Sequence, residues 1–216
     1  MRPLLLAFAL FATTAVHAAG STQLVASAGS NLSLEGSSNV KDWRCGGTTL
    51  EARMDVAAPL EQVNHIIDRI EDGDVARLDP RAASFPQPKF QLRVPVQSLR
   101  CGNRQMERDM YKALRSEANP VIDFRFNGLV GGVEHDIDSG LYRATIAGVL
   151  MLAGERRSVQ IPVEATRVAR DRFRLRARLP LRMTDFSITP PTALFGMVRA
   201  KNELVVHFDL YLRSGS

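Results

Sequence analysis

Residues that usually carry catalysis are scarce in this sequence. Its 216 residues include four His and two Cys, and none of them stands in an H-E-x-x-H metal motif, a G-x-S-x-G nucleophile motif or a paired C-x-x-C zinc motif. The glycine pairs Gly46-Gly47 and Gly131-Gly132 lack the context of a phosphate-binding loop. We therefore expect no catalytic residue, no metal ligand and no cofactor, and a binding protein rather than an enzyme.

Long apolar runs, a strong charge bias and a dense set of cysteines are missing as well. No apolar run reaches the ~18 residues that a membrane-spanning helix needs. A net charge of +5 with 45% apolar residues is too weakly charged and too apolar for a disordered chain. Two cysteines cannot build a multi-disulfide scaffold. The composition is typical of one globular domain.

The first residues have the pattern of a secretory signal peptide. Arg2 precedes an apolar stretch at residues 4–16, and Val16 and Ala18 are small residues at the −3 and −1 positions. A membrane anchor is the weaker interpretation, because ~13 apolar residues are short for a bilayer. We expect cleavage after Ala18 and a periplasmic or secreted protein, with a lead-in segment at residues 19–30 and one domain at residues 31–213.

Export changes the interpretation of the two cysteines. An oxidising compartment favours disulfides, and Cys45 and Cys101 allow one intrachain pairing. The alternative is a pair of free, buried thiols. We predict the disulfide.

Short runs of alternating apolar and polar residues dominate the rest of the chain. Period-2 alternation is typical of strands with one buried face, and these runs predict about eight strands at residues 32–37, 50–56, 90–97, 122–127, 142–152, 157–166, 171–181 and 204–213. Helical spacing of apolar residues predicts two short helices, at residues 59–72 and 103–116. Pro162 should lie at a strand edge or bulge, because proline donates no hydrogen bond.

These elements predict a mostly β fold, a closed eight-stranded antiparallel barrel with two short helices in its connections. An eight-stranded barrel is either filled by its side chains or holds one slim ligand. A two-sheet sandwich is the competing architecture.

Large apolar residues, most of them in the predicted strands, have two interpretations. They either fill the barrel or line a tunnel through it. The tunnel-lining candidates are Phe124, Phe126, Tyr142, Ile146, Leu150, Phe173, Met183, Phe186 and Phe208.

Four arginines alternate along one predicted strand, at Arg172, Arg174, Arg176 and Arg178. One interpretation is the solvated outer face of a strand. The other is a patch for transient contact with an anionic membrane surface. Export argues against nucleic acid as a partner.

Several stretches, taken in order, resemble the YceI-like family of exported bacterial polyisoprenoid-binding proteins. They are LEGSSNVKDW at residues 34–43, VPVQSL at 94–99, NPVIDF at 119–124, AGVLMLAG at 147–154 and MTDFSI at 183–188. The resemblance runs from about residue 31 to 212. Lys41 departs from it, because relatives often carry a histidine there, and Arg44-Cys45 and Arg100-Cys101 look particular to a subgroup.

The resemblance implies a lipocalin-like barrel whose apolar tunnel holds an isoprenoid chain, such as a quinone tail or a polyprenyl lipid, for carriage or sequestration. It implies binding and not catalysis. Two rival hypotheses stay open: a non-catalytic envelope interaction or structural module with a filled barrel, and an enzyme, such as an isomerase, that uses the tunnel. The sequence leaves open the identity of the lipid, the strand face that lines the tunnel and the oligomeric state.

Overall fold

A computed structural model describes residues 20–73, 77–78 and 88–215. The predicted signal peptide, at residues 1–18, lies outside them. The strands in chain order are β1 (Thr22–Ala26), β2 (Asn31–Ser38), β3 (Asp42–Gly47), β4 (Glu51–Val56), β5 (Arg77–Leu78), β6 (Lys89–Pro95), β7 (Val121–Asp136), β8 (Leu141–Leu152), β9 (Glu155–Ala169), β10 (Arg172–Arg182), β11 (Thr192–Ala193) and β12 (Val198–Ser214). The helices are α1 (Leu60–Glu71), α2 (Arg104–Ala113) and the short 3-10 turns η1 (Val96–Ser98), η2 (Met183–Phe186) and η3 (Leu194–Gly196).

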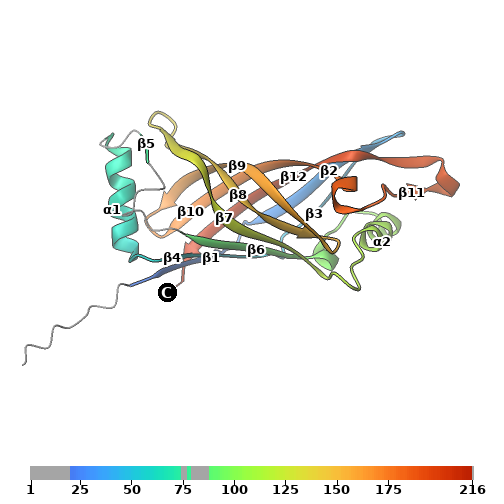
Figure 1. The fold of residues 1–216 in the computed structure, drawn as a ribbon, viewed down its shortest axis with the longest axis horizontal. Helices are drawn as coiled ribbons and strands as arrows, with labels where there is room; N and C mark the ends of the chain where they lie inside the picture. The colour runs from blue at the N-terminus through green and yellow to red at the C-terminus, as the bar shows by residue number, and fades with distance from the viewer. Residues whose placement is uncertain (1–19, 74–76, 79–87, 216) are drawn as a thin grey trace, which may run out of the picture.

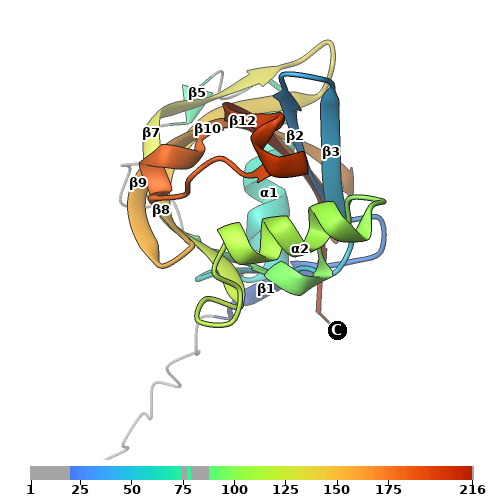
Figure 2. The same ribbon diagram turned by 90° about the vertical axis from the view of Figure 1, so that its right-hand side faces the viewer.

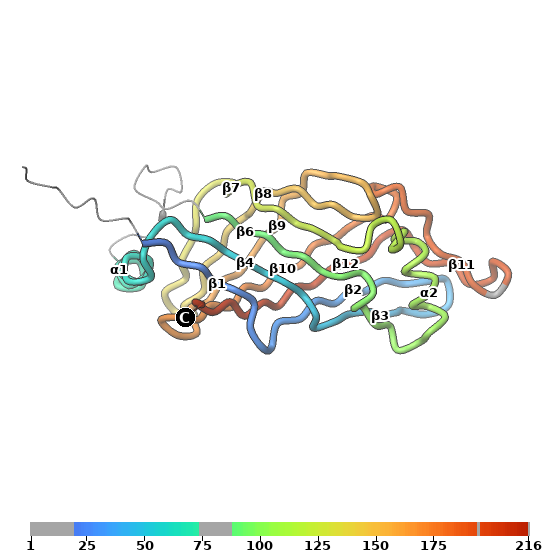
Figure 3. Tube along the Cα trace, turned by 90° about the horizontal axis from the view of Figure 1, so that it is seen from below, coloured from blue at the N-terminus to red at the C-terminus, as the bar shows by residue number. Residues whose placement is uncertain are grey.

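Eight strands close into an elongated antiparallel barrel. Their order around the wall is β1-β4-β6-β7-β8-β9-β10-β12, and β12 pairs back onto β1 through Leu24 and Ser214 (Figures 1 and 3). The β1–β12 pairing joins the eight strands into one circle, whereas a sandwich would keep two separate sheets. The predicted barrel is therefore confirmed.

Strand β1 corrects the predicted start of the domain. The sequence assigned residues 19–30 to a lead-in segment, but Thr22–Ala26 pairs with both β4 and β12 and closes the barrel. Leu24 is buried, and the buried Thr22 hydroxyl donates to the Ala58 carbonyl at 2.7 Å. The alternation in this strand was hidden because it is five residues long and small polar residues flank it.

At the end of the barrel near α2, the β2–β3 hairpin completes the wall in place of β1. There β12 pairs with the β2–β3 hairpin, and Gly46 of β3 forms an isolated bridge with Arg100, in the segment between η1 and α2. Cys45 and Cys101 form a disulfide beside this bridge. The predicted disulfide is thus confirmed, and it ties the last strand of the hairpin to the opposite side of the wall.

The two helices lie at opposite ends of the barrel, and α2 crosses the opening that faces the viewer in Figure 2. Both predicted helices are confirmed, with shifted ends. Pro59 is the N-cap of α1 and not its first helical residue. The Asn103 side chain caps α2 by accepting from the Gln105 and Met106 amides, and the helix ends at Ala113. Within the described residues, no helix has the length and apolar character needed to span a bilayer.

Strands β9 and β10 separate halfway along the barrel. Their ladder ends at Val163 and Ala177, and Pro162 is the next residue of β9. Pro162 therefore lies at the end of this pairing, as predicted, because its ring nitrogen has no hydrogen to donate.

Candidate functional site

Two cavities occupy the barrel interior. The smaller, of about 330 Å³, lies under α1 and is here called the α1-side cavity. The larger, of about 950 Å³, lies beside α2 and is called the α2-side cavity. Both have predominantly apolar linings, as expected where each strand turns one alternating face inward.

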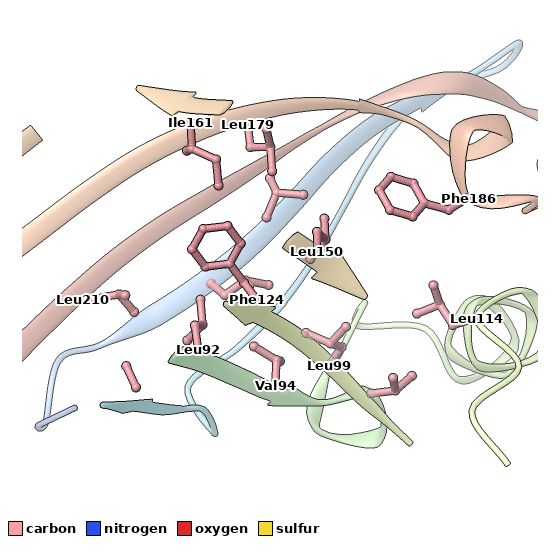
Figure 4. Packing of buried hydrophobic residues seen from close by; sticks show 14 of the residues in the cluster. Leu92, Val94, Leu99, Leu114, Phe124, Leu150, Ile161, Leu179, Phe186 and Leu210 are labelled. Atoms are coloured by element: carbon pink, nitrogen blue, oxygen red, sulfur yellow. The ribbon is translucent and has the colours of Figure 1, made fainter. Parts of the chain in front are cut away.

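A waist of buried side chains separates the two cavities. Phe124 of β7 lines the α1-side cavity, whereas its cross-strand partner Leu150 of β8 lines the α2-side cavity. Both are buried, at 5% and 6% exposure. On β12 the boundary falls between Phe208 and Val206. Figure 4 shows Phe124 and Leu150 within the buried cluster that crosses the barrel at this level.

All nine tunnel-lining candidates border one of the two cavities. The α1-side cavity is lined by Phe124, Phe126, Tyr142, Ile146, Phe173 and Phe208. The α2-side cavity is lined by Leu150, Met183 and Phe186. That these residues contact a ligand stays a prediction.

Helix α1 covers the α1-side cavity with its apolar stripe. Val63, Ile66, Ile67 and Ile70 all line this cavity. The sequence predicted the stripe but not the surface that it covers, because helical spacing does not specify a helix's packing partner.

Polar contacts fasten α1 to the barrel wall. Arg167 of β9 is mostly buried and pairs with Asp68 at 2.6 Å and with Glu71. Tyr142 of β8 donates its hydroxyl to Glu71 at 3.0 Å, and Asn64 donates its amide to the Arg170 carbonyl. These contacts join α1 to two strands, and we call Arg167, Asp68, Glu71 and Tyr142 the α1 latch.

Contacts within the latch shift the pKa values of Tyr142 and Asp68. Burial, together with the bond to Glu71, raises the pKa of the Tyr142 phenol, so this group stays a donor at neutral pH. The hydrogen bond from Arg167 lowers the pKa of Asp68. The hydrogen bonds from Arg167 to Asp68 and from Tyr142 to Glu71 are therefore favoured at neutral pH.

The α2-side cavity contains a residue that the sequence analysis did not select. Trp43 of β3 lines it, together with Met106 and Met110 of α2. The indole nitrogen Nε1 of Trp43 is buried and has no hydrogen-bond partner among the described residues. The pairing of a lone tryptophan with Gly36 across the hairpin was the available signal, since glycine leaves room for a ring above it.

The four alternating arginines project from the outer face of β10. Arg174 binds Asp209 through two hydrogen bonds, and this contact raises its pKa. Arg176 pairs with Glu164 at 3.2 Å. Because neighbouring carboxylates neutralise part of their charge, these two arginines fit the solvated outer face of a strand better than a membrane-binding patch.

The histidines in the described part of the chain do not share a site. His207 lies 3.2 Å from Glu35 on the outer face, and His135 stacks on Tyr142 with ring centroids 4.4 Å apart. Among the residues described, no three His, Cys, Asp or Glu side chains gather where they could share a metal ion.

Comparison with known proteins identifies the family of this chain. The sequence model of the YceI-like domain matches residues 60–212. The chain belongs to the YceI-like family. The matched region of this YceI-like chain runs from the start of α1 into β12. It contains both α-helices and the strands from β5 onward, and it leaves out β1 to β4.

Solved structures share this YceI-like fold. A polyisoprenoid binding domain from Saccharophagus degradans, implicated in plant cell wall breakdown, has a TM-score of 0.60 at 11% identity and covers 89% of this chain and 98% of its own. BcnA from Burkholderia cenocepacia has a TM-score of 0.56 at 16% identity and covers 84% of this chain and 95% of its own. No curated protein matches the chain.

Proposed function

We propose that this protein holds an isoprenoid lipid, of the quinone or polyprenyl class, inside its barrel and carries or sequesters it outside the cytoplasm. The observation that carries this proposal is the pair of apolar cavities, of about 330 and 950 Å³, inside the barrel. Likeness to a structure described as a polyisoprenoid binding domain supports the same ligand class.

The physical argument rests on burial. An isoprenoid chain is nearly insoluble in water, and transferring its surface into an apolar cavity is favourable by about 25 cal/mol per Å². A lining with few polar groups selects the ligand by shape and apolar area. No covalent chemistry is needed, which agrees with the scarcity of catalytic motifs in the sequence.

The alternative function is a non-catalytic envelope module with a filled barrel. Protein interiors are normally packed with few voids larger than a water molecule. The α2-side cavity exceeds that size many times over, at about 950 Å³. This volume favours a ligand over a filled core. The place of action follows from the predicted signal peptide and is part of the proposal.

Lipid extraction tests the proposal. The protein is purified under native conditions from the periplasm of a bacterial host that makes quinones and polyprenyl lipids, and native mass spectrometry then measures its mass. We expect a bound species that organic extraction releases as an isoprenoid of defined mass. A protein that carries no extractable lipid, and takes up none when supplied with isoprenoids, would refute carriage.

A pair of neighbouring substitutions on β8 checks that the lipid lies inside the barrel. Leu150 borders the α2-side cavity and is buried, whereas the next residue, Met151, is 39% exposed. Leu150→Arg should abolish lipid uptake, because it places a charge in an apolar cavity, and Met151→Arg should preserve it. Phe124→Arg should act like Leu150→Arg. Circular dichroism identifies the variants that fold, and the milder Ile146→Gln replaces any that do not. Equal uptake by folded inner-face and outer-face variants would contradict an interior site.

A further inference from the structure

The described residues that line the α1-side cavity are apolar apart from Tyr142, Thr166, Arg167 and Arg176. Tyr142 and Arg167 belong to the α1 latch, and Arg176 pairs with Glu164. Thr166 pairs across the ladder with Arg174, on the face that carries the alternating arginines. This end of the barrel therefore suits the hydrocarbon end of a lipid.

The α2-side cavity contains an unmet hydrogen-bond donor. Three side chains in the described residues have buried nitrogen or oxygen atoms without a partner: Trp43, Asn64 and His135. Of these, Trp43 alone lines either cavity. Leaving a buried donor unsatisfied costs about 1–3 kcal/mol, and tryptophan Nε1 usually finds an acceptor when it is buried. Among the described residues no atom accepts a hydrogen bond from Nε1–H, so this donor suits an acceptor atom on a bound ligand.

The hairpin fixes the indole in place. Trp43 lies opposite Gly36 in the β2–β3 register. A Cβ atom at Gly36 would come within 2.2 Å of Trp43 Cζ2, so the ring lies directly on the glycine. Beside Trp43, Cys45 is tied to Cys101 by the disulfide. A donor held by close packing is preorganised and loses little freedom when it binds an acceptor.

We propose that Trp43 Nε1–H donates a hydrogen bond to a carbonyl oxygen on the head group of the bound lipid. The lipid then lies with its head in the α2-side cavity and its isoprenoid tail directed toward the waist and α1. This inference rests on the proposed function, and it assigns to that function a head-group residue, an orientation and the quinone class of ligand.

Charge around the cavity favours an uncharged carbonyl over a phosphate. The lining carries three cations, Lys41, Arg44 and Arg182, and two acids, Asp42 and Asp109. Arg44 pairs with Glu35 at 3.3 Å and Arg182 with Glu203 at 3.6 Å, so Lys41 stands against two acids of the same lining. A phosphate would bring its own negative charge into an apolar cavity and would need free cations there. One neutral donor suits one neutral acceptor, which is the arrangement that a quinone carbonyl offers.

Three probes with matched C20 isoprenoid chains test the proposal: a benzoquinone with a four-unit tail, geranylgeranyl monophosphate, and the oxygen-free hydrocarbon phytane. Affinities for the wild-type protein and for Trp43→Phe are measured by native mass spectrometry. The substitution keeps an aromatic ring but removes the donor. We expect the affinity for the quinone to fall about five- to tenfold more than the affinity for phytane, as the loss of one hydrogen bond implies.

Phe186→Leu is the matched control, because Phe186 borders the same cavity without a donor. This substitution should lower the affinities for the quinone and for phytane by the same factor. An equal loss for both probes in Trp43→Phe would overturn the role of Nε1. Stronger binding of the phosphate than of the quinone by the wild-type protein would overturn the carbonyl head group. Failure of the wild-type protein to bind any of the three probes would count against the proposed function itself.

Fluorescence gives an independent measure of orientation. Trp43 is the single tryptophan of the chain, so its emission reports on this position alone. A quinone ring quenches tryptophan on contact, and phytane does not. We expect quenching that saturates at one quinone per protein. Binding of the quinone without quenching would place the head at the α1 end and overturn the proposed orientation.

Discussion

At the scale of single residues, Gly148 decides how Phe124 packs at the waist. A Cβ atom at Gly148 would lie 2.4 Å from Phe124 Cζ and 2.5 Å from the Arg125 carbonyl oxygen. The carbonyl belongs to the paired backbone of β7 and cannot move aside as a flexible side chain could. We predict that Gly148→Ala lowers the free energy of unfolding by about 1–3 kcal/mol.

Gly128→Ala on β7 is the control for this prediction. A Cβ atom there meets nothing within 4 Å, and alanine costs less backbone entropy than glycine in a strand. Urea unfolding should therefore show unchanged or slightly higher stability for Gly128→Ala. Similar stabilities for the two variants would mean that Gly148 does not control the packing of the waist.

Residue patterns predicted part of the barrel lining. Alternation grouped the apolar residues of each strand on one face, because period 2 is a local property that the pleat enforces, but it did not specify which face lines the interior. Met183 and Phe186 border the α2-side cavity from η2, outside any alternating run. Alternation could not reveal the division into two cavities. That division depends on which side chains from different strands border the same cavity, such as Leu150 of β8 and Val206 of β12. These residues lie far apart in the sequence, so a local pattern cannot show it. Trp43 was missed as a site residue for the same reason, since the absence of a partner for Nε1 depends on the whole neighbourhood.

At the scale of elements, α1 is a cover held by charged contacts. Arg167 is 17% exposed as a side chain and bonds to both Asp68 and Glu71. Arg167→Gln removes the cation that both carboxylates share and leaves Asp68 with only the more exposed Arg170, 3.5 Å away. We predict faster hydrogen–deuterium exchange across α1 in this variant at neutral pH, with exchange in the barrel strands unchanged. Arg53→Gln, which breaks the exposed pair with Asp55 in β4, should leave α1 unaffected.

The contacts of the α1 latch should also weaken at acid pH. The pKa of Asp68 is lowered in the folded protein by the hydrogen bond from Arg167, whereas an unfolded aspartate titrates near ~4. A carboxyl group whose pKa is lowered by folding stabilises the folded protein above the pKa that it has in the unfolded chain. This stabilisation is lost as the pH falls through the pKa of the folded state. We therefore expect the difference in α1 exchange between wild type and Arg167→Gln to shrink below about pH 4. A difference that stays constant down to pH 2 would show that charge pairing does not hold the helix.

Both helices were predictable from sequence, whereas β1 was not. Helical periodicity in α1 and the Asn103 cap of α2 are local signals of ten to twelve residues. Strand β1 is short, and it is stabilised by partners at Met54 and Leu212, which lie far along the chain. Its assignment depends on barrel closure, a property of the molecule as a whole.

At the scale of the whole molecule, the Cys45–Cys101 disulfide completes the wall at the α2 end. The β1–β12 pairing closes the barrel near α1, but at the α2 end the β2–β3 hairpin is joined across the wall by the Gly46–Arg100 bridge and by this disulfide. A link between cysteines 56 residues apart restricts the unfolded chain considerably, and we predict that its loss lowers the free energy of unfolding by about 3–4 kcal/mol.

Two independent ways of removing the disulfide test this prediction. Urea unfolding is compared for the oxidised protein, the protein treated with reductant and the double variant Cys45→Ala, Cys101→Ala. The reduced protein and the variant should agree, and reductant should not change the variant. Because the lost link borders the α2-side cavity, both forms should also release bound quinone faster than the oxidised protein. Two free thiols in non-reducing mass measurements of the natively purified protein, or equal stability of its oxidised and reduced forms, would show that the hairpin closes the barrel without the covalent link.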